Sequence, residues 1–250
     1  MAINVNTVYT TVLSILNKEQ RGYITPEEFN KLGTQVQLEI FENYFEDLNQ
    51  QLRVPQADSE YANRQKNIDN CISIFKTIGN TTYNVAGGYF LPPSDLHRIG
   101  TVIYKDEKEL QRVERNDFLN INLSPLTKPT TQFPVYLYEQ VVQGTGGANT
   151  GETHIFVKPT TIVTAADITV SYIRKPADIV WGYQQLGGGT WTSGPYIYNS
   201  ATSTQFELDN TEQTEVILRI LAYAGVVIRD PQIVQAASQA VQSEEVNSKS

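Results

Sequence analysis

The chain has 250 residues, of which 40% are apolar and 10% aromatic, so it can bury a sizeable core as one large domain or two small ones. Its net charge of −8 disfavours a groove that grips phosphates, which needs clustered Lys and Arg, although DNA can still slide past a like-charged wall. No run approaches roughly 18 consecutive apolar residues, and no basic segment leads into an apolar block at the start, so we expect neither a membrane-spanning helix nor a secretory signal.

The first third of the sequence predicts helices. Asn6 or Thr7 is a candidate N-cap for a short helix with an apolar side made of Val8, Val12, Ile15 and Leu16. Residues 25–28 are a stronger start signal, because they combine a threonine cap, a proline at the first helical position and a glutamate three residues after the cap.

The helix that starts there should be long. Its apolar side chains recur at almost every fourth residue as far as Pro55, namely Phe29, Leu32, Val36, Ile40, Tyr44, Leu48 and Leu52. A third helix over residues 59–78 would carry Ile68, Ile72, Phe75 and Ile78 on one side. An antiparallel hairpin of the second and third helices is the simplest packing.

From Thr81 to about Leu208 the pattern changes to short strands. Gly and Pro separate alternating or β-branched runs at 89–91, 99–104, 135–142, 154–157 and 168–173. Strands near a ten-residue spacing favour an antiparallel sheet or a small sandwich. Residues 114–123 predict one short helix within it. The segment 182–205, rich in Gly, Ser, Thr and Tyr, predicts a hairpin loop with exposed aromatic residues.

The sequence near the end of the chain predicts a further helix with an apolar face, over residues 211–230. One face collects Val216, Ile217, Ile220, Leu221, Ala224, Val227 and Ile228, and Pro231 ends or kinks the helix. The tail beyond it has a thin apolar side made of Ile233, Val234, Ala237 and Val241. That side is too small to anchor a free helix, but it suits an arm that lies on a neighbouring subunit. A frayed terminus is the alternative interpretation.

These elements predict an α+β chain. Residues 1–80 and 206–250 would form a helical bundle with a C-terminal arm. Residues 81–205 would form an antiparallel β-sandwich-like module inserted into it.

Two segments imitate ligand-binding motifs. Residues 17–28 have the spacing of a calcium loop, but Arg21 stands where an oxygen ligand belongs, so a polar turn before a capped helix explains them better. Residues 146–153 have the spacing of a phosphate-binding loop, with glutamate in place of the required lysine and a strand after it in place of a helix. We therefore expect neither a metal nor a nucleotide there.

The remaining reactive side chains do not form a catalytic set. His97 and His154 lack partners at metal or catalytic spacing, and Cys71 lies among apolar residues like a small core residue. The acidic cluster of Glu39, Glu42, Glu46 and Asp47 is interpreted as a solvated helix face, with an acidic lining as the alternative. No cofactor and no enzymatic activity are expected.

The order of segments along the chain resembles known proteins. Its opening, residues 6–50, is similar to a family of virion structural proteins of short-tailed bacteriophages, including crAss-like phages. Residues 90–104, FLPPSDLHRIGTVIY, resemble a strand of head-to-tail adaptor proteins. The segments that follow in the same order are LQRVERNDFLN, PVYLYE, IFVKP and ITVSYIRKP.

This resemblance implies a virion protein assembled in the host cytoplasm and placed at the head–tail junction. It would be a ring subunit, commonly in a dodecamer, that contacts the portal and adjacent tail or ring proteins while double-stranded DNA passes without specific binding. The C-terminal arm and the hairpin aromatics Trp191, Tyr196 and Tyr198 are the candidate contacts, and packing of these rings under their own loop is the alternative. A tail tube or nozzle subunit is one alternative. A sugar- or receptor-binding β-sandwich on a helical stalk is another.

Overall fold

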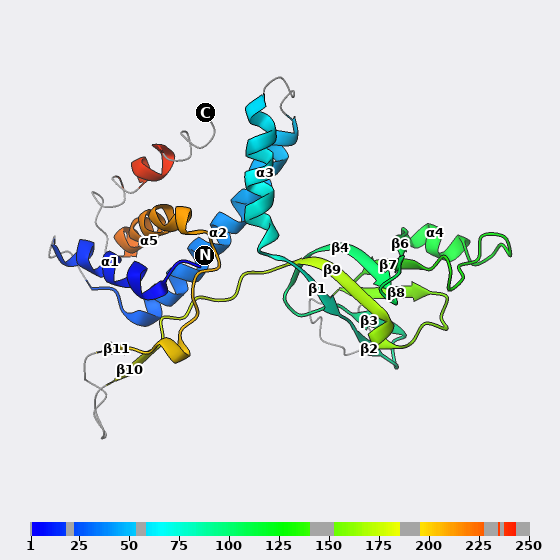
Figure 1. Cartoon of the computed structure of the whole chain (residues 1–250). Helices are drawn as coiled ribbons and strands as arrows, with labels where there is room; N and C mark the ends of the chain where they lie inside the picture. The colour runs from blue at the N-terminus through cyan, green and yellow to red at the C-terminus, as the bar shows by residue number, and fades with distance from the viewer. Residues whose placement is uncertain are drawn as a thin grey trace. The chain divides into compact units, whose positions relative to one another are not determined.

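The computed structural model describes residues 2–18, 23–53, 59–140, 153–185, 196–227, 235 and 238–243. The fold is mixed α+β, as predicted, and it divides into two compact units (Figure 1). One unit contains Met1–Ile74 and Pro176–Ser250, and the other contains Phe75–Lys175. The chain therefore passes between the units at Ile74–Phe75 and again at Lys175–Pro176.

The first unit is built on helices from both ends of the sequence. They are α1 (Val5–Lys18), α2 (Pro26–Arg53), α3 (Ser59–Ser73) and α5 (Gln213–Val227), the last preceded by the 3₁₀ turn η3 (Asn210–Glu212). Both α1 and α2 pack against α5, and α3 packs against α2. Val216, Ile220, Leu221 and Ala224 of α5 are all buried, which confirms the apolar face predicted for this helix.

The starts of α1 and α2 are set by side-chain caps. At α1 the carboxamide oxygen of Asn4 accepts from the N–H groups of Asn6 and Thr7 at 2.9 and 3.1 Å, so this helix begins before the predicted caps. At α2 the Glu28 carboxylate accepts from the N–H and the hydroxyl of Thr25 at 2.9 and 2.8 Å. The Glu28 N–H donates to the Thr25 hydroxyl in return. This reciprocal pair is the predicted capping box.

The prediction that a third helix reaches residue 78 is wrong. The helix α3 ends at Ser73, and strand β1 (Lys76–Asn80) starts three residues later. Phe75 is buried, as a helical face also predicts, but Ile78 is 67% exposed because strand side chains alternate between faces. The β-branched Thr77 and Ile78 favour the strand, and Gly79 disfavours continuation of the helix.

The second unit contains two sheets. The first has the order β1, β9 (Ile168–Arg174), β4 (Leu96–Tyr104), β5 (Lys108–Glu109), and all its pairs are antiparallel. The second has the order β2 (Thr82–Asn84), β3 (Tyr89–Leu91), β8 (His154–Lys158), β7 (Val135–Glu139), β6 (Gln111–Arg112). Its pair β6–β7 is parallel, so the expectation of a purely antiparallel module is wrong at this edge.

Single buried residues carry the chain from one sheet into the other. Thr81 separates β1 from β2, and both its N–H and its hydroxyl donate to the Ile168 carbonyl, at 3.3 and 3.1 Å. Leu110 separates β5 from β6, and its N–H donates to the Val102 carbonyl at 2.8 Å. Strands that bend between sheets in this way form corners. The two sheets consequently share one apolar cluster, which includes Phe90, Val102, Tyr104, Tyr136, Ile155, Val170 and Tyr172.

Residues 176–205 belong to the helical unit, so the sequence-based boundary of the β module at residue 205 is wrong. Three polar side chains of α2 at helical spacing hold this returning segment. Asn30 accepts from the Trp181 N–H at 2.7 Å, and the Thr34 hydroxyl accepts from the Ile179 N–H at 3.0 Å. The Gln37 amide donates to the Ala177 carbonyl at 2.8 Å. The segment continues into the hairpin of β10 (Tyr183–Gln185) and β11 (Tyr196–Tyr198), within the range predicted for one.

Candidate interaction surfaces

A series of aromatic rings connects the helical core to the β10–β11 hairpin. It starts at the buried pair Phe29 and Tyr9, with ring centroids 4.9 Å apart, and continues to Trp181 at 4.4 Å from Tyr9. Trp181 in turn lies 6.1 Å from Tyr183 and 5.7 Å from Tyr198. The Trp181 indole N–H donates to the Asn6 side chain of α1 at 3.1 Å. Trp181 therefore fixes the base of the hairpin to the helices.

The register of the hairpin decides which side chains it displays. Tyr183 pairs with Tyr198, and Gln184 pairs with Ile197, so Ile197 lies on the face opposite to the two tyrosines. Tyr196 completes the aromatic face in an edge contact with Tyr183 at 4.8 Å. Tyr196 is 36% exposed and Ile197 45% exposed, whereas Tyr198 is half-buried beside Trp181.

We call the described strands of this hairpin, residues 183–185 and 196–198, the tyrosine hairpin. A two-stranded hairpin is marginally stable in water by itself, so its packing on Trp181 is what makes it an ordered surface. It belongs to an uncharged stretch, because no charged residue or histidine occurs between Asp178 and Glu207. The predicted contact residue Trp191 lies outside the described residues.

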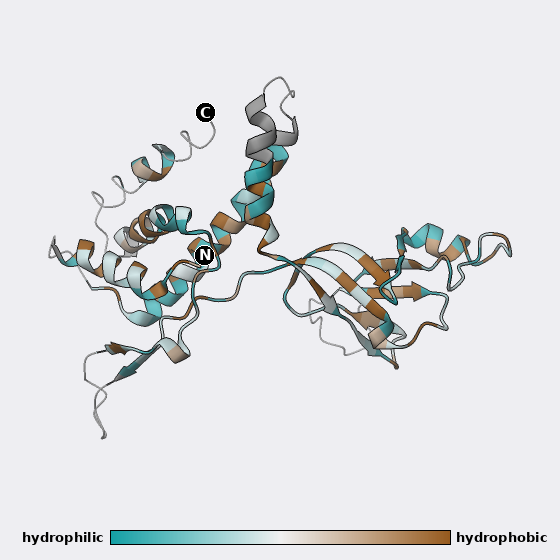
Figure 2. Cartoon of the chain, in the orientation of Figure 1, coloured by the Kyte–Doolittle hydropathy of each residue, from teal (hydrophilic) through white to brown (hydrophobic). Residues whose placement is uncertain are grey.

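A second surface lies between α4 (Arg115–Asn120) and β7, and sequence reasoning missed it. The segment of residues 119–133, here called the apolar loop, comprises the last two residues of α4 and the loop after it, and it exposes Leu119, Leu123, Leu126 and Phe133 to solvent. Apolar colouring runs along this part of the chain in Figure 2. A sequence signal existed: between Asp117 and Glu139 the only charged residue is Lys128.

The apolar loop is held in place by its own hydrogen bonds. The Asn122 side chain donates to the Phe118 carbonyl at 2.8 Å, and the Thr127 hydroxyl donates to the Ile121 carbonyl at 3.2 Å. Beneath the loop, Phe118 is buried against Val135 and Leu137 of β7. The exposed leucines are therefore displayed by an anchored segment.

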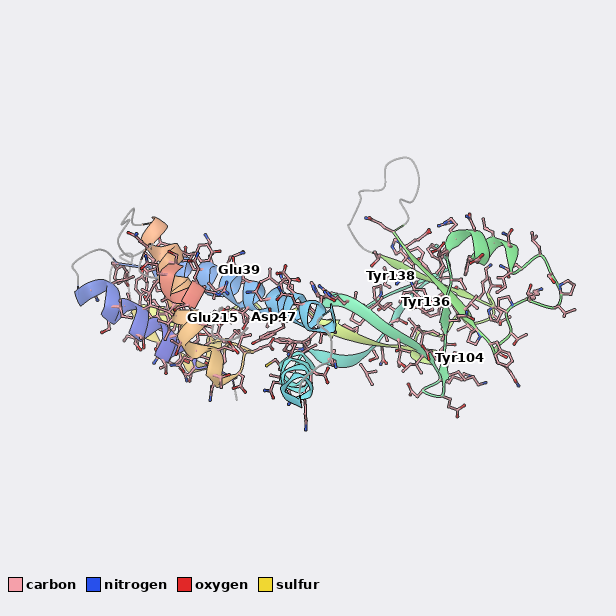
Figure 3. The ribbon with its side chains drawn as sticks, turned by 90° about the horizontal axis from the view of Figure 1, so that it is seen from above. Glu39, Asp47, Tyr104, Tyr136, Tyr138 and Glu215 are labelled. Atoms are coloured by element: carbon pink, nitrogen blue, oxygen red, sulfur yellow. The ribbon has the colours of Figure 1, made fainter. Side chains whose placement is uncertain are left out.

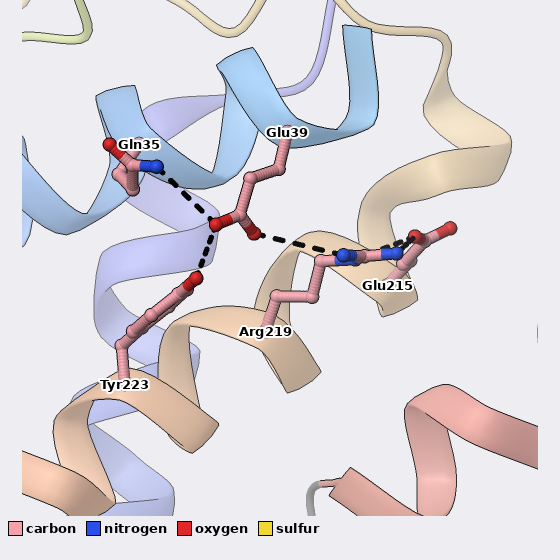
Figure 4. Close-up of polar contacts among 5 residues, drawn as sticks. All are labelled: Gln35, Glu39, Glu215, Arg219 and Tyr223. Atoms are coloured by element: carbon pink, nitrogen blue, oxygen red, sulfur yellow. Dashed lines mark hydrogen bonds and ion pairs between the residues drawn. The ribbon is translucent and has the colours of Figure 1, made fainter. Parts of the chain in front are cut away.

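A polar network joins α2 to α5, and it changes the interpretation of the acidic cluster (Figure 4). The Glu39 carboxylate accepts from the Tyr223 hydroxyl and from the Gln35 amide, and it lies 3.7 Å from the Arg219 guanidinium. Arg219 also binds Glu215, one helical turn earlier, at 2.6 Å. The hydrogen bond to Glu39 raises the pKa of Tyr223. Glu39 is thus part of a contact between helices and does not simply face solvent.

The other acidic positions differ from one another. Glu42 and Asp47 are half-buried, and Glu46 is exposed. Figure 3 labels Asp47 and Glu39 on α2 and Glu215 on α5. The cluster is consequently neither a uniform solvated face nor a uniform acidic lining.

A hollow of about 600 Å³ lies between β6, α4 and β7 in the second unit. Its charged side chains include Arg112, Glu114, Arg115 and Glu139. Arg115 pairs with Glu139, and this pairing raises the pKa of Arg115 and lowers the pKa of Glu139. The Arg112 guanidinium lies 5.7 Å from the centre of the Tyr138 ring, and the Tyr138 hydroxyl accepts from Thr153 at 2.6 Å. Tyr138 is labelled in Figure 3. These groups are used in contacts with each other.

The structure covers only part of the predicted C-terminal arm. Residues 238–243 are helical, and Val241 is half-buried there. Ile233, Val234 and Ala237 lie outside the described residues, as does Pro231.

The described residues of the two motif-like segments have structural roles. Glu28, the last ligand position of the calcium-like loop, is used in the capping box. Thr153, the end of the phosphate-like segment, leads into strand β8. His154 is buried, and its ring centroid lies 4.1 Å from that of Tyr89. Cys71 is half-buried, and burial raises the pKa of its thiol. Within the described ranges, no three His, Cys, Asp or Glu residues are grouped to hold a metal.

No family model matches the chain, and no curated protein matches its sequence. None of the helices in the described part of the chain is long and apolar enough to cross a membrane.

Proposed function

We propose that this chain is a non-enzymatic virion protein of a short-tailed bacteriophage, a subunit of a head-to-tail adaptor ring. In this proposal a dodecameric ring of identical copies joins the portal to the tail, and double-stranded DNA passes through it without specific binding. The helices from both ends of the chain form the bundle of each subunit, which carries the second unit as a β-sandwich-like module.

The observation that carries the proposal is the pair of ordered, exposed and nearly uncharged surfaces, one on each unit. Ile197 and Tyr196 are displayed on a hairpin fixed by Trp181, and Leu126 is displayed on a loop anchored at Phe118. Exposed aromatic and aliphatic side chains in a rigid frame are typical of contacts between proteins. Such surfaces suit assembly better than chemistry on a small substrate.

The C-terminal arm is the proposed contact with the portal or an adjacent ring. Its apolar residues Ile233, Val234, Ala237 and Val241 would contact the partner, and their burial there would contribute to docking. The acidic chain fits a channel from which the DNA backbone is repelled.

The test is co-sedimentation with candidate portal rings. A chain lacking residues 232–250 should stay folded and fail to join the rings, while the full chain joins them. A matched full-length variant with Ile233, Val234 and Val241 changed to Ser should also fail, because it removes the apolar side without shortening the arm. If both variants co-sediment like the full chain, the arm has no docking role.

The hollow beside β6 favours a second candidate, a sugar- or receptor-binding function of the second unit. It combines the Tyr138 ring with the Asn116 amide and charged groups. Arg112 already covers that ring, which weakens this candidate. Binding of the full chain to a glycan array, lost in Asn116→Ala, would support it. A tail tube or nozzle subunit would show the same ring and would differ by its place in imaged virions.

A further inference from the structure

We propose that the apolar loop of one copy docks on the tyrosine hairpin of the next copy, so that contacts of this kind close the ring. The inference rests on the proposed ring function and names the surfaces that neighbouring subunits use. The apolar loop belongs to the unit Phe75–Lys175, and the tyrosine hairpin belongs to the helical unit.

The apolar loop exposes four large apolar side chains to solvent. Leu119, Leu123, Leu126 and Phe133 have exposed fractions between 59% and 97%. Together they present on the order of 500 Å² of apolar surface, the size of the largest apolar patch on a typical monomer, which is often functional. The hairpin exposes less apolar surface than this, so a single contact falls below the usual area of a stable interface.

The distribution of charge favours a second copy, bound through the hairpin, as the occupant. Each copy carries a net charge of −8, so two copies repel each other where their carboxylates come close. The contact should therefore use surfaces that lack carboxylates. The apolar loop has Lys128 as its single charge, and the stretch containing the hairpin has none. Both surfaces satisfy this condition.

The same charge favours loop on hairpin over loop on loop. A symmetric contact between two apolar loops would bring two Lys128 ammonium groups together. On the hairpin, Lys128 would meet exposed tyrosine rings instead, where a cation over an aromatic face is attracted to it. Tyr196 supplies such a ring on the aromatic face of the hairpin, where it contacts Tyr183.

A contact between two different faces has a consequence for assembly. Each copy offers one loop and one hairpin, so successive copies add in one direction until the rotation closes a ring. A single contact of this size is weak. In a closed ring every copy makes two of them, which strengthens the whole assembly through effective concentration.

The test is a cross-link between two separately prepared batches of the full chain. In a Cys71→Ser background, one batch carries Leu126→Cys and the other carries Tyr196→Cys, and the two are mixed with portal rings before a short bis-maleimide is added. We expect a 126–196 cross-linked dimer only in the mixture. A 126–126 cross-link in the first batch alone, or rings without any 126–196 cross-link, would overturn the inference.

A second experiment distinguishes a specific contact of the apolar loop from non-specific hydrophobic association. Leu126→Ser with Phe133→Ser should weaken ring assembly by about tenfold or more, the effect of losing hot-spot side chains. Val85, which is exposed in the same unit, provides the control, and Val85→Ser should assemble normally. Unchanged assembly of the double variant would contradict the inference while leaving the ring intact. If the unaltered chain forms no ring at all, the proposed function fails and the inference with it.

A lipid surface is the competing occupant. Flotation of the full chain with neutral phosphatidylcholine vesicles, abolished by Leu126→Ser and Phe133→Ser, would assign the apolar loop to membrane insertion. That result would overturn docking on the hairpin. We expect no flotation.

Discussion

The Trp181 ring lies 4.4 Å from the Tyr9 ring, centroid to centroid, and the Trp181 indole N–H donates to Asn6 on the same helix. Residues far apart in the sequence are joined here, because Trp181 follows the β unit and α1 opens the chain. The contact makes the tyrosine hairpin an extension of the helical core. Its stability should therefore depend on Trp181.

Replacing Trp181 with Ala should lower the free energy of unfolding by about 3 kcal/mol or more, the usual cost of deleting a buried large aromatic ring. Urea denaturation followed by far-UV circular dichroism measures it. The control Trp181→Phe keeps a ring and loses the hydrogen bond to Asn6, so it should cost about 1 kcal/mol for that bond plus a modest packing loss. Equal effects of the two substitutions would show that the ring packing contributes little.

Changing Ile220 and Leu221 together to Asp should unfold the helical unit, because two charges would lie unpaired among buried apolar residues of α5. The expected result is loss of the cooperative melting transition by circular dichroism. Ile15→Asp on the exposed side of α1 is the matched control and should melt like the unaltered chain. A normal transition in the double variant would remove α5 from the core.

Replacing Arg219 with Met should destabilise the contact between α2 and α5 by about 1–3 kcal/mol, because the partly buried Glu39 and Glu215 would lose their shared cation. Adding Glu39→Gln should recover part of the loss, and the double-mutant cycle gives the coupling between the two residues. Glu46→Gln, an exposed change on the same helix, should stay within about 0.5 kcal/mol. Additive effects of Arg219→Met and Glu39→Gln would contradict the network.

Replacing Thr25 with Ala should cost about 1 kcal/mol, the usual value for a lost N-cap. The Thr25 N–H and hydroxyl hold the pKa of Glu28 below its ordinary value of 4.5. A lowered pKa stabilises the folded chain above the unfolded pKa, and that stabilisation is lost as the pH falls through the folded pKa. Thr25→Ala keeps the backbone N–H, which is the larger cause, and removes only the hydroxyl, so the pKa of Glu28, followed by carboxyl NMR, should move part of the way back upward. An unchanged pKa would mean that the hydroxyl does not contribute to the shift.

The sequence predicts well those elements whose signal is local. The capping box at Thr25 and Glu28, the apolar face of α5 and strand β3 all follow from residue spacing alone. The hairpin in 182–205 follows from its Gly- and Tyr-rich composition. Each of these depends on neighbours within a few turns or strand positions, so tertiary contacts did not need to be known.

Other features depend on contacts that the sequence does not reveal. Ile78 suits a helical period and a strand equally well, and only the pairing of β1 with β9, in which it lies opposite Ser171, decides between them. Asn30, Thr34 and Gln37 resemble a solvated helix face, yet they bind the backbone of the segment after Lys175. Similarly, Leu126 looks like a core residue in the sequence, and only the structure shows its side chain in solvent.

The central claim is that copies of this chain assemble with one another and with a portal. Native mass measurement of the purified chain, alone and mixed with candidate portal rings, tests it most directly. We expect a monomer or small oligomer alone, and in the mixture a single added mass corresponding to a full ring of copies. Portal rings that keep their own mass, or that gain only isolated single copies, would contradict the account.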